Sequence, residues 1–135
     1  MQLMQQPVTG TAQNLPAHDN TMDTGPMGCC VSVIVLWNPN AAGVYQNVRG
    51  FHGGGGAQAV NYASLIAGVP AHATTQVFVF NGPDNRSDLE RRIVNREVRN
   101  NILVHLHGIQ VRIYHGIASA TVDRSAQVTL TSYER

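Results

Sequence analysis

The sequence predicts a single α/β domain, a sandwich with a mixed, largely antiparallel sheet and elements in the order β-β-α-β-α-β-β. Two observations support this fold class. Short apolar runs, typical of strands, alternate along the chain with two stretches whose apolar residues have helical spacing. The chain has 135 residues, 43% of them hydrophobic and 13% charged, which suits one folded domain with one modest core.

The first predicted strands form a β-hairpin. An apolar run over Cys29–Trp37 leads into the turn residues Asn-Pro-Asn at 38–40, and a second strand-like run follows over Val44–Phe51. The remaining elements are a helix over 57–67, a strand over Gln76–Phe80, a helix from Leu89 to about His107, a strand over Ile109–His115, and a closing hairpin of Thr121–Asp123 and Gln127–Ser132.

Residues 1–23 are rich in Gln, Asn, Thr and Pro and show no period. We expect them to form an N-terminal arm or leader without strands, extended against the body or mobile, followed by one catalytic-like domain over 24–135. Residues 1–10 lack the basic region and apolar stretch of a secretory signal. The predicted location is therefore the cytoplasm, or a host cell reached without a classical signal peptide.

Charge and hydropathy argue against two classes of partner. The net charge of +1, with scattered arginines, gives no nucleic-acid footprint, and no apolar run approaches the ~20 residues that a membrane helix needs. The chain contains no lysine. A GC-rich genome explains this most simply, although a protein acting inside a host cell would also gain from offering no lysine to ubiquitin. The sequence leaves the oligomeric state open.

The predicted hairpin brings a thiol and an imidazole together. Opposed residues of an antiparallel pair have a constant index sum. If Cys30 faces His52, that sum is 82 and the turn centres on Ala41, between the two runs. The two side chains would then share one rung, as Cys–His nucleophilic catalysis requires. A bulge near Gly50 or a slip of one residue would change this pairing.

Cys30 is the candidate nucleophile. It begins a strand directly after a glycine-rich turn, whose backbone N–H groups could lower the pKa of the thiol and stabilise an oxyanion. Gly28 and Cys29 would supply those N–H groups. A small buried hydrophobe is the alternative role for a cysteine here, and it stays open. Cys29 is the second candidate thiol, because alternation points the two side chains to opposite faces.

His52 is the candidate general base, since an imidazole with a pKa near ~6.5 exchanges protons at neutral pH. The alternative is a histidine in a flexible glycine-rich loop. A zinc site made of Cys29, Cys30 and His52 lacks a fourth ligand at any standard spacing. Neither a metal nor another cofactor is therefore predicted.

Four glycines, Gly53, Gly54, Gly55 and Gly56, precede the first predicted helix. Backbone N–H groups in such a run can approach an anion, which permits a phosphate site. Without a lysine the run is not a P-loop. A mobile connection between hairpin and helix explains the glycines equally well.

Residues 24–33, Thr-Gly-Pro-Met-Gly-Cys-Cys-Val-Ser-Val, resemble the active-site segment of the chemoreceptor glutamine deamidases, the CheD family. In that family a Thr and a Gly precede the catalytic Cys at the distances that Thr24 and Gly28 keep from Cys30. Residues 106–111 are similar to the family's helix-to-strand corner. The catalytic domains of the cytotoxic necrotizing factors resemble this fold and share its use of a Cys–His pair.

The resemblance implies a deamidase that hydrolyses the side-chain amide of a glutamine in a target protein, as a bacterial effector or toxin. Cys30 would attack the carboxamide carbon, His52 would carry the proton to departing ammonia, and Thr24 would orient the site. At the family's usual distance from Cys to His this chain has Asn47. His52 can therefore serve only if the hairpin is longer here.

Two further functions remain open. Residues 38–42, Asn-Pro-Asn-Ala-Ala, and 52–57, His-Gly-Gly-Gly-Gly-Ala, resemble two loops of the macrodomains. That resemblance implies an ADP-ribose or phosphate-binding module in which the four glycines contact the anion. The third possibility is a structural or partner-binding domain without a catalytic site.

Overall fold

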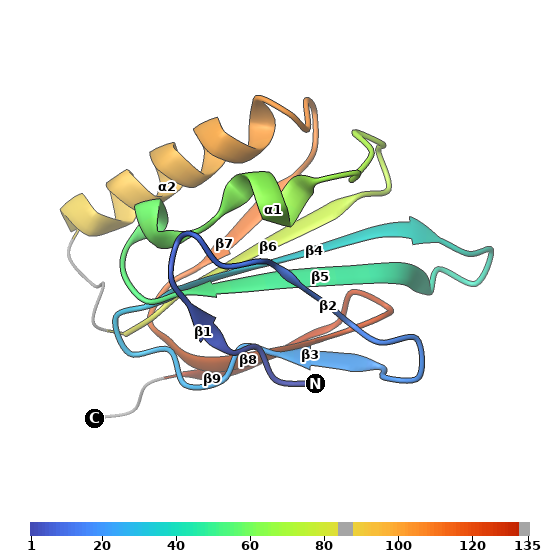
Figure 1. Ribbon diagram of the computed structural model, residues 1–135, viewed down its shortest axis with the longest axis horizontal. Coiled ribbons are helices and arrows are strands. Elements are labelled where there is room, and N and C mark those ends of the chain that lie inside the picture. The colour runs from blue at the N-terminus through green and yellow to red at the C-terminus, as the bar shows by residue number, and fades with distance from the viewer. Residues whose placement is uncertain (84–87, 133–135) are drawn as a thin grey trace.

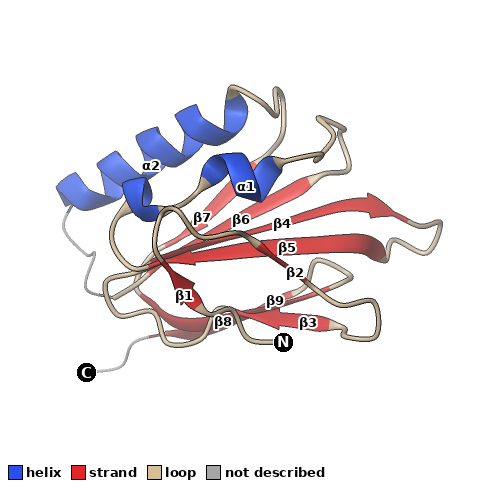
Figure 2. Cartoon of the chain, in the orientation of Figure 1, coloured by secondary structure: helices blue, strands red, loops and turns tan. Residues whose placement is uncertain are grey.

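The computed structural model describes residues 1–83 and 88–132, which form three layers. Helices cover one face of a large sheet, and a small sheet covers its other face (Figure 1, Figure 2). The predicted α/β class with a mixed sheet is confirmed. The element order differs from the predicted one, because the described residues hold nine strands and two α-helices.

The large sheet is built around a hairpin of β4 (Val31–Pro39) and β5 (Tyr45–Gly53). β6 (Gln76–Asn81) pairs antiparallel with β4, and β7 (Val111–Tyr114) pairs parallel with β6. Two short strands from the N-terminal region pair with the open edge of β5. The hairpin predicted from the sequence is therefore the centre of the fold.

The small sheet contains β3 (Thr21–Asp23), β8 (Ile117–Asp123) and β9 (Val128–Ser132) in the order β3-β8-β9. The predicted closing hairpin is present, although its first strand begins earlier than expected. Buried Arg124 lies in the turn of this hairpin and joins it to the rest of the fold. Its guanidinium donates hydrogen bonds to the carbonyls of Pro16, Asp19, Tyr45 and Gln46.

β4 is covered on both faces, which explains its nearly continuous apolar sequence. Val31, Val33 and Val35 belong to the core beneath the helices, whereas Ile34 and Leu36 belong to the core between the two sheets. Alternate side chains of one strand thus enter two separate cores.

The helices are shorter than predicted. Instead of one helix over 57–67, the chain forms a 3-10 turn at Ala57–Ala59 and then α1 (Tyr62–Ile66). Asn61 separates them because its side chain caps α1, accepting a hydrogen bond from Ser64 N at 3.1 Å. α2 (Asp88–Leu103) ends before the expected stop near residue 107. No helix in the described part of the chain is long and apolar enough to cross a membrane.

The N-terminal arm lies extended against the body, which is one of the two expected arrangements, but the expectation that it forms no strands is wrong. It forms β1 (Gln5–Gln6), parallel to β5, and β2 (Gln13–Asn14), antiparallel to β5, as well as β3. Leu3 and Met22 are fully buried in the core between the sheets. Strands of two or three residues are too short to produce a hydrophobic period, so the sequence pattern gave no signal for them.

Gly50 allows the arm to pack this closely. A Cβ atom at this position of β5 would lie 2.6 Å from Met22 Sδ and 2.8 Å from Leu3 Cδ1. Gly55, five residues further on, offers a contrast, because the nearest atom to its Cβ position is 3.5 Å away.

We predict that Gly50→Ala destabilises the fold by about 1–3 kcal/mol, because two buried side chains must move to admit the methyl group. Urea unfolding gives the measurement, as a lower midpoint at unchanged slope. Gly55→Ala is the matched control and should change the free energy of unfolding by less than ~0.5 kcal/mol. Equal stability of the two variants would contradict the packing of the arm against β5.

Candidate functional site

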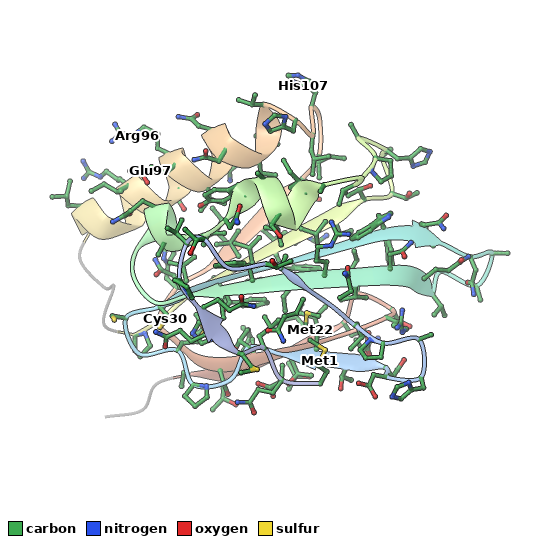
Figure 3. The ribbon with its side chains drawn as sticks, in the orientation of Figure 1. Met1, Met22, Cys30, Arg96, Glu97 and His107 are labelled. Atoms are coloured by element: carbon green, nitrogen blue, oxygen red, sulfur yellow. The ribbon has the colours of Figure 1, made fainter. Side chains whose placement is uncertain are left out.

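Cys30 lies immediately before β4, at the end of a turn that contains two glycines in the left-handed region, Gly25 (φ 73°) and Gly28 (φ 50°). The thiol is buried, with 7% of the residue exposed. Its backbone is fixed on both sides: Cys30 N donates to Met27 O at 2.7 Å, and Gly82 N donates to Cys30 O at 3.0 Å. Figure 3 places Cys30 at the end of the hairpin near β1.

His52 lies near the end of β5 and is 3% exposed. Its Nδ1 lies 2.7 Å from the carbonyl oxygen of Thr24, in the segment that follows β3. A carbonyl can only accept a hydrogen bond, so Nδ1 carries the proton and Nε2 has the lone pair. Nε2 is buried and has no hydrogen-bond partner among the described residues. The site therefore contains a buried base whose tautomer is fixed.

Thr24 is completely buried and is held by its own side chain. Its Oγ1 donates to Gly25 O at 2.8 Å and accepts from Ala120 N at 3.0 Å. The orienting role that the resemblance implies for Thr24 would thus pass through its backbone carbonyl, which contacts His52.

The register of the hairpin differs from the predicted one. Ser32 is the residue opposite His52, so the index sum is 84 rather than 82. The prediction that Cys30 faces His52 directly is therefore wrong by one rung. A shift of two residues keeps both side chains on the same face, as diagonal neighbours. The turn around Asn40 accounts for the shift, because its side chain accepts from Ala42 N and Val44 N and moves the centre of the turn to residue 42.

Gln5 is a site residue that the sequence analysis missed. It pairs with His52 in the parallel register of β1 and β5. Its Oε1 accepts a hydrogen bond from Cys30 Sγ at 3.7 Å. A side chain can take this path because Gly54 has none, and a Cβ atom at Gly54 would collide with Gln5 Nε2. No signal in the sequence distinguished this glutamine from its neighbours in the arm.

Ser32 is the second residue that was missed. It is completely buried opposite His52, and its Oγ donates to Met27 Sδ at 3.3 Å. The sequence did carry a signal here, because Ser32 is the one polar residue in the apolar run from Val31 to Trp37.

The thiol of Cys30 is not activated in this arrangement. Burial raises its pKa, and neighbouring Cys29 adds to that rise through its charge and a hydrogen bond. The expectation that backbone N–H groups lower the pKa is thus wrong. The N–H of Cys30 donates to Met27 O and is not available to an oxyanion. The two predicted oxyanion donors, Gly28 and Cys29, are both exposed.

A cavity of about 560 Å³ opens beside His52. The N-terminal arm contributes residues 2–5 to its lining, and the segment after β3 contributes Thr24, Gly25 and Pro26. His52 is the titratable side chain of this lining, although its Nε2 atom is buried.

Asn47 lies away from this site. It pairs with Trp37 in β4, on the face of β5 that carries Phe51, which packs beneath the helices. Since Asn47 and His52 are an odd number of residues apart, their side chains point to opposite faces. The pairing of β4 with β5 extends past Asn47 to Gly53, so His52 lies within the hairpin.

The two macrodomain-like segments do not form one site. Residues 38–42 lie in the hairpin turn, whereas Gly53 to Gly56 follow the opposite end of β5, about 30 Å away along the strand. Gly53 and Gly54 serve close packing, against Ala59 and Gln5 respectively. The described residues contain no group of three or more His, Cys, Asp or Glu side chains that could hold a metal ion.

We predict a pH dependence of stability that arises from His52. Burial lowers the pKa of His52, and the hydrogen bond to Thr24 O opposes this shift more weakly. The unfolded chain therefore binds the proton more tightly than the folded one. Its contribution to stability is complete above the ordinary histidine pKa of ~6.5 and is lost as the pH falls through the lower folded value.

Chemical unfolding between pH 7 and 5 measures this loss, at most ~1.4 kcal/mol per pH unit. His52→Gln should reduce it, because glutamine can donate to Thr24 O but does not titrate. His18→Gln, at an exposed ring, should retain the wild-type profile. Parallel profiles for the wild type and His52→Gln would contradict the assignment of a buried neutral imidazole.

No protein-family model matches the chain, and no curated protein matches it. A function is therefore inferred from the fold and the geometry of the site.

Proposed function

We propose that the chain is a cysteine hydrolase that converts a glutamine side chain of a target protein to glutamate. Cys30 is the nucleophile and His52 the general base. One observation carries the proposal: the buried Nε2 of His52, in its acceptor form and without a partner among the described residues, shares a sheet face with the buried thiol of Cys30. An unpaired buried acceptor costs about 1–3 kcal/mol, a cost that functional sites tolerate.

The reaction has two steps, acylation of Cys30 and hydrolysis of the thioester, and His52 carries a proton in both. Cys30 Sγ attacks the carboxamide carbon as its proton passes to His52 Nε2, and His52 then protonates the departing ammonia. A thioester remains. Water, deprotonated by His52, attacks it, which releases glutamate and restores the thiol. Thr24 O stabilises the imidazolium that forms twice in this cycle, because it accepts from Nδ1.

The raised pKa of Cys30 fits a thiol that ionises only when its proton has an acceptor. At neutral pH a buried thiol is protonated and resists oxidation and alkylation. Since His52 is one rung away, proton transfer requires a small movement that brings sulfur and Nε2 into contact. Substrate binding beside the arm would produce that movement.

The proposed substrate is a glutamine side chain of a target protein. The protein would be a bacterial effector or toxin that deamidates a host protein, in the cytoplasm or after delivery into a host cell. The absence of lysine from the chain agrees with this role. No cofactor enters the reaction.

We predict that the wild type releases ammonia from denatured β-casein and that Cys30→Ser lowers the rate at least ~10³-fold. His52→Gln should lower it ~10²–10⁴-fold, since it retains the hydrogen bond to Thr24 O but cannot accept the proton. A coupled ammonia assay measures both rates. Cys29→Ser removes the exposed thiol but keeps the backbone N–H of that position, and it should lower the rate less than Cys30→Ser does.

Three results would contradict the proposal. Ammonia release by Cys30→Ser at the wild-type rate would remove the nucleophile, and loss of activity in Cys29→Ser alone would transfer its role to the other thiol. No release by the wild type would favour a structural or partner-binding domain without a catalytic site.

A further inference from the structure

The thiol of Cys30 already has a carboxamide beside it. Gln5 Oε1 lies 3.7 Å from Cys30 Sγ, and the side chain of Gln5 is exposed although the thiol is buried. Gln5 therefore stands between the sulfur and solvent. Its functional group is the same one that the proposed hydrolase acts on.

The local structure positions this one glutamine among several. Gln6, the next residue, is turned away and bonded to Thr11, whose N donates to Gln6 Oε1 at 3.1 Å and whose O accepts from Gln6 Nε2 at 2.7 Å. Gln13 accepts from Met4 N at 2.8 Å. Among the glutamines of the described residues, Gln5 is the one whose side chain crosses the bare backbone at Gly54 and contacts the thiol.

The backbone around Gln5 also resembles a bound substrate. β1 is only two residues long and lies at the edge of the sheet, where it pairs with His52 and Gly53 of β5. Addition of an extended strand to an open sheet edge is a common mode of peptide recognition. β1 occupies the position that such a peptide would take, with its glutamine side chain at the nucleophile.

We propose that Gln5 is an internal substrate of this site: Cys30 deamidates Gln5 of its own chain to glutamate. This inference rests on the proposed function. The bond from Cys30 Sγ to Gln5 Cδ forms as the C–N bond breaks, and ammonia leaves with the proton that His52 took from the thiol. Water then cleaves the thioester, which leaves a carboxylate at position 5 and a thiol at Cys30. Water can reach the thioester because Gln5 is exposed.

The product changes the charge beside the thiol. A carboxylate at position 5 accepts a hydrogen bond from a protonated thiol more strongly than the carboxamide does. It also repels the thiolate that would form during attack on a further amide. Deamidation of Gln5 therefore disfavours ionisation of Cys30.

The test is mass spectrometry of the purified full chain, with fragmentation of its N-terminal peptide, after incubation in heavy-oxygen water. We expect conversion of Gln5 to glutamate with one heavy oxygen atom, and no conversion of Gln6 or Gln13. Cys30→Ala should abolish the conversion, whereas Cys29→Ala, which keeps the backbone N–H of that position, should retain more of it than Cys30→Ala. Loss of the mass of ammonia, followed by conversion of position 5 to a hydroxamate with hydroxylamine, would also support the inference as a trapped Cys30–Gln5 thioester.

The outcomes separate this inference from the proposed function. Ammonia release from β-casein together with an unchanged Gln5 would overturn the internal reaction and leave the hydrolase standing. If Gln5 is unchanged and casein is not a substrate, both fall. Conversion of Gln5 that persists in Cys30→Ala, or that extends equally to Gln6, would mark spontaneous deamidation and overturn the inference.

A second measurement tests the position of Gln5 without any turnover. Gln5→Ala should make Cys30 react with iodoacetamide about tenfold faster than in the wild type, because the side chain that covers the thiol is gone. Gln6→Ala is the matched control and should leave the rate unchanged. Equal rates in the three proteins would overturn the placement of Gln5 over the thiol.

Discussion

The hydrogen bond between His52 and the carbonyl of Thr24 connects the two sheets at the candidate site. It is 2.7 Å long, and it joins a strand of the large sheet to the segment that follows β3 of the small one. Because a carbonyl fixes the tautomer of the ring, the same contact decides that Nε2 is the basic nitrogen. The same bond therefore links the two sheets and fixes the tautomer of His52, and the buried side chain of Thr24 holds that carbonyl in place.

The turn before β4 exposes one of two adjacent thiols and buries the other. Cys29 is exposed and Cys30 is buried, although they are adjacent in the chain. Burial raises the pKa of Cys30 and keeps its thiol protonated at neutral pH, while the arm covers it through Gln5. In the proposed hydrolase, a thiol in this state would react only after the arm moves. The N-terminal segment is for this reason a component of the site, rather than an extension outside the domain.

The sequence predicted the central hairpin, the later strands and the closing hairpin, because their apolar runs are long enough to show a pattern. It also singled out Cys30, His52 and Thr24, which the fold does bring to one region. The register was missed by one rung, since Asn40 sets the turn through side-chain hydrogen bonds that residue spacing alone does not reveal. β1 and β2 were missed because two residues cannot establish a period. Gln5 was missed for the same reason, as its role comes entirely from pairing across the sheet edge.

Gly54 sets the length that a side chain of β1 needs to reach Cys30 Sγ. A residue on the outer strand must span the bare backbone at this position, and the carboxamide of a glutamine arrives at Cys30 with its oxygen in contact. An asparagine is shorter by one carbon–carbon bond, ~1.5 Å, and its amide would stop above the glycine. Discrimination between these two amides would then arise from the width of one strand rather than from any group that recognises the amide itself.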